Sequence, residues 1–187
     1  MTPREQFIDF VLGAIMSLPQ HLKGTLRLVD DPNIPDEGRA IAAGAVLHWL
    51  GGSNTIPGVR GGVLSYVDDV LVLRLAYARI EAIAPEAMAT HRSDSPELFG
   101  GLTEEVALLR SYLGKGAAVL DRAVERIEHL KHKGVTAAQC VSDPDAGTML
   151  YEAVHAALVD LDLEEEAVSR ALKQLDPVLD GLRQRSG

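Results

Sequence analysis

Residues 65–84 read SYVDDVLVLRLAYARIEAIA, and this stretch decides the fold. Its apolar residues fall on nearly every side of a helix, most densely at residues 70–73. A helix that is apolar all round is normally buried by other helices. The stretch therefore predicts a central helix with the rest of the chain packed around it.

The composition favours helices along the whole chain. Ala and Leu dominate, whereas aromatic residues make up only 4% of the 187 residues. Ala and Leu lose little conformational freedom in a helix, and no stretch shows the clean alternation of a β-strand. We therefore expect an all-α fold, a compact bundle of about six to eight helices.

The second half carries two apolar stripes with alternating four- and three-residue spacing, one over residues 102–130 and one over residues 154–182. Such stripes are typical of amphipathic helices that pack against each other. They predict a long antiparallel helical pair, weakened at Gly114 and Gly116 and kinked at Pro177. Between the stripes, Thr136 with Gln139 forms a capping-box pattern, and Asp143-Pro144 is a second helix start.

Residues 85–101 are the best candidate for a linker, because they hold Pro85, Pro96 and paired glycines. We expect a single helical domain over residues 1–187. The open alternative divides it into a helical part at residues 1–84, this linker, and the helical pair at residues 102–187.

The net charge of −9 argues against nucleic-acid binding, which needs a basic face to neutralise phosphates. Cys140 is the single cysteine, so no intramolecular disulfide is possible. The first residues make a poor signal peptide, and no apolar run reaches the length of a membrane span. These features favour a cytoplasmic protein without a transmembrane span.

Residues 31–76 resemble a small bacterial family of unknown function typified by YkvA. The resemblance is carried by a Pro-containing lead at residues 31–35, a helix ending at residues 47–50, Ile56-Pro57, and Tyr66-Val67-Asp68-Asp69 before an apolar helix. The chain departs from the pattern at Gly58, where Asp usually follows, and at Ser65, which replaces a glycine. The resemblance implies a helical fold, and the family offers no activity to carry over.

Asp68 and Asp69 are the sharpest local feature. Two adjacent carboxylates at a helix start suit Mg²⁺ or Mn²⁺, which prefer oxygen ligands. The structural alternative is a capping box with Ser65, or a buried ion pair with Arg39, Arg60 or Arg74. His48, beside Trp49, is interpreted as a hydrogen-bonded core residue rather than a ligand.

Glu152 and His155 have the spacing of half a di-metal site in a helical bundle, but no second such motif follows. The candidate metal ligands are therefore Asp68, Asp69, Glu152 and His155. They belong to an alternative reading of the chain as a metal-dependent enzyme acting on a phosphorylated or small polar substrate.

The leading hypothesis is a non-enzymatic protein that binds a protein partner or itself and needs no cofactor. It rests on the absence of a complete catalytic set in the sequence and on the two apolar stripes, whose spacing suits helix–helix association. The proposed interaction residues are Leu158, Glu165, Val168, Leu172, Leu175 and Leu179. A third alternative is a small-ligand-binding bundle with an apolar pocket around the central helix.

Overall fold

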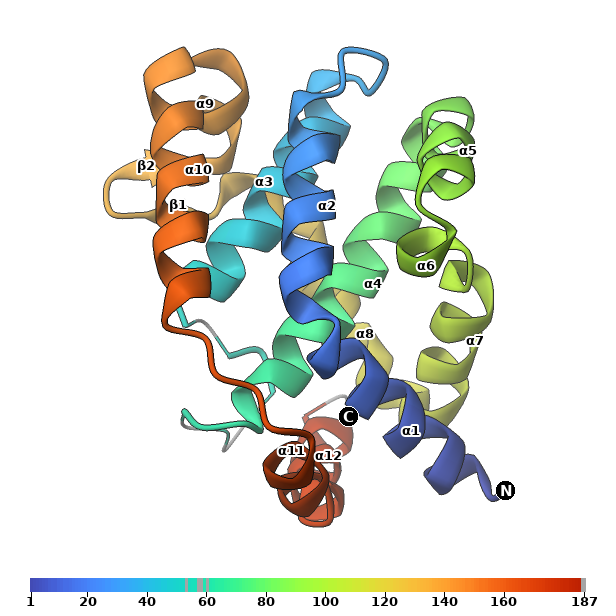
Figure 1. The fold of residues 1–187 in the computed structure, drawn as a ribbon. Helices are drawn as coiled ribbons and strands as arrows, with labels where there is room; N and C mark the ends of the chain where they lie inside the picture. Colours follow the sequence, from blue (N-terminus) through green and yellow to red (C-terminus); the bar gives the residue numbers. More distant parts are fainter. Residues whose placement is uncertain (53, 57–58, 60, 186–187) are drawn as a thin grey trace.

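The chain folds into short helices around one long one, as the computed structural model of residues 1–52, 54–56, 59 and 61–185 shows (Figure 1). Helices make up 78% of it, which confirms the all-α class. The first half forms α1 (Pro3–Met16), α2 (Leu18–Asp30), α3 (Asp36–Leu50), α4 (Ser65–Ile83), α5 (Pro85–Asp94) and α6 (Pro96–Phe99). The second half forms α7 (Leu102–Leu113), α8 (Ala117–Glu125), α9 (Ala137–Ser142), α10 (Pro144–Val159), α11 (Glu165–Leu172) and α12 (Leu175–Gln184), with 3-10 turns η1 (Gly114–Gly116) and η2 (Ile127–His129).

Helix α4 is the centre of the fold, as residues 65–84 predict. It contacts α1, α3, α5, α7 and α8, and Figure 1 shows it running between them. Its side chains from Val67 to Tyr77 are all buried. Because so much of its surface is covered, α4 fixes the positions of residues at its own ends, including Asp68 and Asp69.

Helix α3 packs closely on its neighbours because its residues are small. A methyl group at Gly44 would lie 2.2 Å from the carbonyl oxygen of Ile127 in η2, so only glycine fits there. Ala42, Ala43 and Ala45 beside it are buried. The small-residue side of α3 therefore lets a second chain segment approach its backbone.

The prediction of a long antiparallel helical pair is wrong in detail, because both apolar stripes are broken into shorter helices. Gly114 ends α7 with a φ of 54°, a conformation that few other residues adopt. The second stripe is interrupted by residues 160–164, and Pro177 lies in the first turn of α12, where proline is tolerated. The resulting helices pack in different directions, α10 against α3 and α11 against α1 of the first half, and α12 against η1 of the second half.

A small hairpin, which the sequence did not predict, joins η2 to α9. Its strands β1 (Lys131–His132) and β2 (Val135–Thr136) pair antiparallel. Lys133 and Gly134 between them have φ values of 47° and 83°, and positive values at both positions are typical of the tight turns of hairpins. The two predicted helix starts that follow are confirmed, since Thr136 and Gln139 form the capping box of α9 and Asp143 caps α10.

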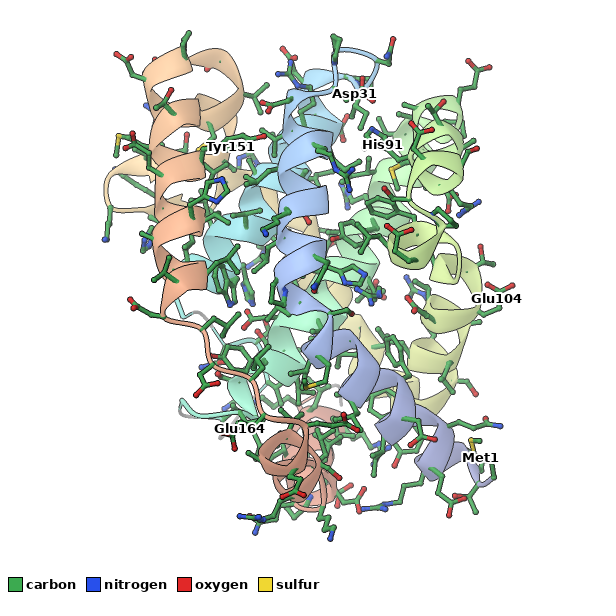
Figure 2. The ribbon with its side chains drawn as sticks, viewed as in Figure 1. Met1, Asp31, His91, Glu104, Tyr151 and Glu164 are labelled. Atoms are coloured by element: carbon green, nitrogen blue, oxygen red, sulfur yellow. The ribbon has the colours of Figure 1, made fainter. Side chains whose placement is uncertain are left out.

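Residues 85–99 are helical rather than a linker loop. Leu98 and Phe99 are buried in the same apolar core as residues from Phe7 to Leu182. At one end of the molecule, His91 of α5 lies 2.8 Å from Asp31, at the end of α2 (Figure 2). The segment is therefore held by both packing and polar contacts.

Within the described residues, no helix combines the length and the apolar character that crossing a bilayer would require.

Candidate functional site

The candidate site lies where α3 ends and α4 begins. His48 is in the last turn of α3, and Asp68 and Asp69 follow the start of α4 at Ser65. The loop between the two helices turns back with Gly52, Gly61 and Gly62 all at positive φ. This return places the imidazole of His48 against both carboxylates, and we call these three side chains the His–Asp–Asp cluster.

Asp68 is completely buried and both of its oxygens are occupied. Oδ2 lies 2.5 Å from Nε2 of His48. Oδ1 accepts hydrogen bonds from the backbone amides of Thr55 and Ile56 at 2.9 and 3.0 Å. Asp68 therefore holds the loop before α4 in place while it faces the imidazole.

These contacts correct the structural alternatives for Asp68. Asp68 does not cap α4, because the helix has no side-chain cap and the Ser65 hydroxyl donates to the carbonyl of Gly62. Arg39 donates to the carbonyl of Val29, and Arg74 pairs with Glu105. Arg60 lies outside the described residues. The partner of Asp68 is therefore His48.

Asp69 is buried, and its Oδ1 has no hydrogen-bond partner among the described residues. Only 6% of the residue is exposed, and Oδ1 lies 3.8 Å from Nε2 of His48, beyond hydrogen-bond distance. Burial, followed by the neighbouring Asp68 carboxylate, raises the pKa of Asp69 to about 8. A buried polar atom without a partner costs free energy, so this carboxylate calls for an explanation.

The cluster brings together three side chains that could hold a metal ion. One ligand atom from each of the three residues lies within 4.8 Å of the other two. Ligands about 2.1 Å from one ion lie roughly 3.0–3.4 Å from each other. The distances from His48 Nε2 to the two carboxylates, 2.5 and 3.8 Å, lie on either side of that range. Small side-chain rotations would therefore bring all three to an ion.

A surface cleft of about 370 Å³ reaches the cluster, with Asp69 in its wall. We call it the Trp49 cleft. It is lined by Trp49, Leu50, Gly52, Asn54, Ser65, Tyr66, Asp69, Ala157, Asp160 and Leu161. The last three come from the end of α10 and the segment after it, which Figure 1 shows descending beside the start of α4. The cleft therefore meets the cluster at Asp69, whose Oδ1 is itself shielded from solvent.

Glu152 and His155 do not join this cluster. Both are exposed on α10, and they line a separate groove with Tyr151 and Arg39. Their three-residue spacing puts them side by side on that helix. Of the four predicted ligands, the structure brings Asp68 and Asp69 together with His48 and leaves Glu152 and His155 outside that group.

From the sequence, His48 is interpreted as a hydrogen-bonded core residue, and the structure shows it buried against Asp68, but its place beside both aspartates was missed. It lies 20 residues before Asp68 with no partner at helical spacing on α3, so no local pattern marks it. The available signal was its position at the end of a helix that leads into a glycine-rich loop and then into the Asp-Asp pair.

The proposed interaction residues are mostly part of the core. Val168, Leu172, Leu175 and Leu179 are at most 1% exposed. Leu158 is half-buried, and Glu165 is exposed at the start of α11. The second apolar stripe therefore covers this chain's own helices and is not free for a partner.

Comparison of the chain with known protein families, with curated proteins and with solved structures found no match. The resemblance to the YkvA-like family therefore stays a prediction. What can be said of function rests on the side chains of the His–Asp–Asp cluster and of the Trp49 cleft.

Proposed function

We propose that this protein binds one divalent metal ion through His48, Asp68 and Asp69 and presents it to a small ligand in the Trp49 cleft. The observation that carries the proposal is the Asp69 carboxylate, buried beside an imidazole and a second carboxylate with one oxygen unpartnered.

Charge balance supports an ion at this position. Two carboxylates lie beside one imidazole in a buried site, and burial keeps the proton on Asp69 up to about pH 8, so ionising both carboxylates there requires a cation beside them. Buried charges are normally paired or coordinate a metal. A divalent cation neutralises both carboxylates at once and gives the free oxygen of Asp69 a partner.

The donor set indicates the kind of ion. Imidazole suits Zn²⁺ and Fe²⁺, whereas carboxylates suit Mn²⁺ and Mg²⁺. One imidazole with two carboxylates therefore favours Mn²⁺, Fe²⁺ or Zn²⁺ over Mg²⁺, which usually keeps several waters and few protein ligands.

Three protein ligands leave positions for water or substrate, as in catalytic metal sites. A bound ion of this kind polarises a carbonyl or lowers the pKa of a bound water. Asp69 lines the cleft, so these positions are open to molecules that enter it. This is the metal-dependent alternative from the sequence, with His48 in place of Glu152 and His155.

The leading sequence hypothesis, association through the second apolar stripe, stays a prediction. Four of its six proposed interaction residues, Val168, Leu172, Leu175 and Leu179, are buried within the chain. No other observation on these helices favours a partner over the metal site.

Equilibrium dialysis of the purified chain against Mn²⁺, Fe²⁺, Zn²⁺ and Mg²⁺, with the bound metal measured by mass spectrometry, tests the proposal. We expect one equivalent of Mn²⁺, Fe²⁺ or Zn²⁺, and at least tenfold weaker binding after His48→Ala or Asp69→Asn. The matched control is Glu152→Gln with His155→Ala, which removes the exposed pair and leaves binding unchanged. Binding that is lost in the control and kept in Asp69→Asn would refute the site.

A further inference from the structure

The Trp49 cleft carries a second negative charge outside the His–Asp–Asp cluster. Asp160 lines the cleft from the end of α10 and is exposed. It has no hydrogen-bond or ion-pair partner among the described residues. Of the cleft-lining residues that the structure describes, Asp69 and Asp160 are the charged ones, and both are acidic.

The position of Asp160 is electrostatically unfavourable for the folded chain alone. It is the C-terminal cap of α10, and no basic residue lies in the last turn of that helix. The C-terminal end of a helix carries partial negative charge and attracts cations rather than carboxylates. An acid at this point therefore adds to the negative potential of the helix end that borders the cleft.

Two aromatic residues in the cleft wall supply a second feature that is typical of sites for organic cations. Trp49 and Tyr66 both line the cleft, one from the last turn of α3 and one from the first turn of α4. Both residues share the cleft wall with Asp69. Cations bind over the faces of Trp and Tyr, and quaternary ammonium groups are recognised in this way.

We propose that the ligand of the Trp49 cleft is an organic cation, an amine or a quaternary ammonium compound, held by Asp160 and the rings of Trp49 and Tyr66. The inference rests on the proposed metal site, which places an ion at the inner wall of the cleft. Asp69 in that wall is nine-tenths buried, and its Oδ1 has no hydrogen-bond partner among the described residues. Once a divalent ion neutralises Asp68 and Asp69, the charge of Asp160 dominates the cleft. A phosphorylated substrate would meet this negative charge, so the structure favours a cation over an anion.

Trp49 provides the readout, because it is the only tryptophan in the chain. Zn²⁺-loaded protein is titrated with choline, with its neutral isostere 3,3-dimethylbutan-1-ol, and with inorganic phosphate, while tryptophan fluorescence is followed. We expect choline to bind at least tenfold more tightly than the neutral isostere, and this preference to weaken as salt is added. Equal binding of the two, or tighter binding of phosphate, overturns the inference.

Two matched variants test whether the preference for choline depends on the charge of Asp160 itself or on the overall negative charge of the chain. Asp160→Asn keeps the shape of the side chain and should reduce the preference for choline to about twofold or less. Asp162→Asn changes an exposed acid two residues further on, outside the cleft, and should leave the preference intact. A preference that is lost in Asp162→Asn and kept in Asp160→Asn would contradict the assignment.

Zn²⁺ binding is measured in parallel on the same samples. Asp160→Asn should bind Zn²⁺ as the unmodified chain does, because Asp160 is not a member of the cluster. If the unmodified chain binds Zn²⁺ but does not prefer choline, the cation inference fails and the metal site stands. If it binds none of Zn²⁺, Mn²⁺ and Fe²⁺, the proposed function fails, and the inference, which depends on it, fails with it.

Discussion

Nε2 of His48 lies 2.5 Å from Oδ2 of Asp68, and this contact joins the end of α3 to the start of α4. The same carboxylate holds the amides of Thr55 and Ile56 through its other oxygen. One buried side chain thus fixes two helices and the described part of the loop between them. It also sets the place of Asp69, the next residue, beside the imidazole.

Asp68→Ala should lower the free energy of unfolding by about 3 kcal/mol, because it leaves buried donors at Thr55 and Ile56 without an acceptor. Asp68→Asn should cost less, since its amide oxygen can still accept from both amides. Chemical denaturation of the two variants measures the difference. Asp9→Asn, at an exposed position on α1, is the control and should change stability by less than about 0.5 kcal/mol.

Asp69 should make the metal-free protein less stable as the pH rises. Its pKa is about 8 in the folded protein against 3.8 in an unperturbed chain, so the folded state holds the proton more tightly. The stabilisation is complete below about pH 4 and is lost progressively as the pH rises to about 8. Urea denaturation at a series of pH values reports this slope.

Asp69→Asn should remove that slope and raise the free energy of unfolding at pH 8 by about 2 kcal/mol. The gain is limited because the buried amide of asparagine still has unsatisfied hydrogen-bonding groups. A variant that gains stability while it loses metal binding is typical of a functional site. Unchanged pH dependence in Asp69→Asn would show that this carboxylate is not the group that titrates.

Gly44→Ala should destabilise the fold by about 3 kcal/mol, since the added methyl group would meet the backbone of Ile127 in η2. Gly13→Ala is the matched control in α1, where a methyl group meets nothing within 4 Å. That change should stabilise the chain by about 0.5–1 kcal/mol through helix propensity. Thermal unfolding of the two variants should shift in opposite directions, and shifts of the same sign would contradict the close packing of α3.

The parts of the fold that local signals determine could be predicted from the sequence. The apolar residues of α4 predicted its central place, and Thr136, Gln139 and Asp143 predicted helix starts through their own side-chain caps. These features depend on residues a few positions apart. They are therefore visible without knowledge of the tertiary structure.

The breaks in the second half could not be predicted in the same way. Leu109, Leu113 and Leu120 keep a helical spacing across the break at Gly114, because all three face the same core. Spacing reports which side is buried and not whether the backbone stays helical. The antiparallel pair was inferred from spacing alone, and in the structure α10 and α11 contact the first half while only α12 packs against η1 of the first stripe.

The His–Asp–Asp cluster could be predicted only in part from the sequence. Asp68 and Asp69 were identified because they are adjacent, whereas His48 comes from another helix and meets them only through the return of the chain. Glu152 and His155 were chosen because they are close in sequence, and the structure exposes both. Whether residues far apart in the sequence come close together depends on tertiary packing, and a local sequence pattern carries no information about that packing.

A crystal structure of the chain grown with Mn²⁺, with data collected at an energy where manganese scatters anomalously, tests the central claim most directly. We predict one strong anomalous peak about 2.1–2.2 Å from Nε2 of His48 and from one oxygen each of Asp68 and Asp69. Further electron density should extend from the ion toward the Trp49 cleft. The absence of a peak at the His–Asp–Asp cluster with Mn²⁺ in excess, or a peak at Glu152 and His155 instead, would contradict the account.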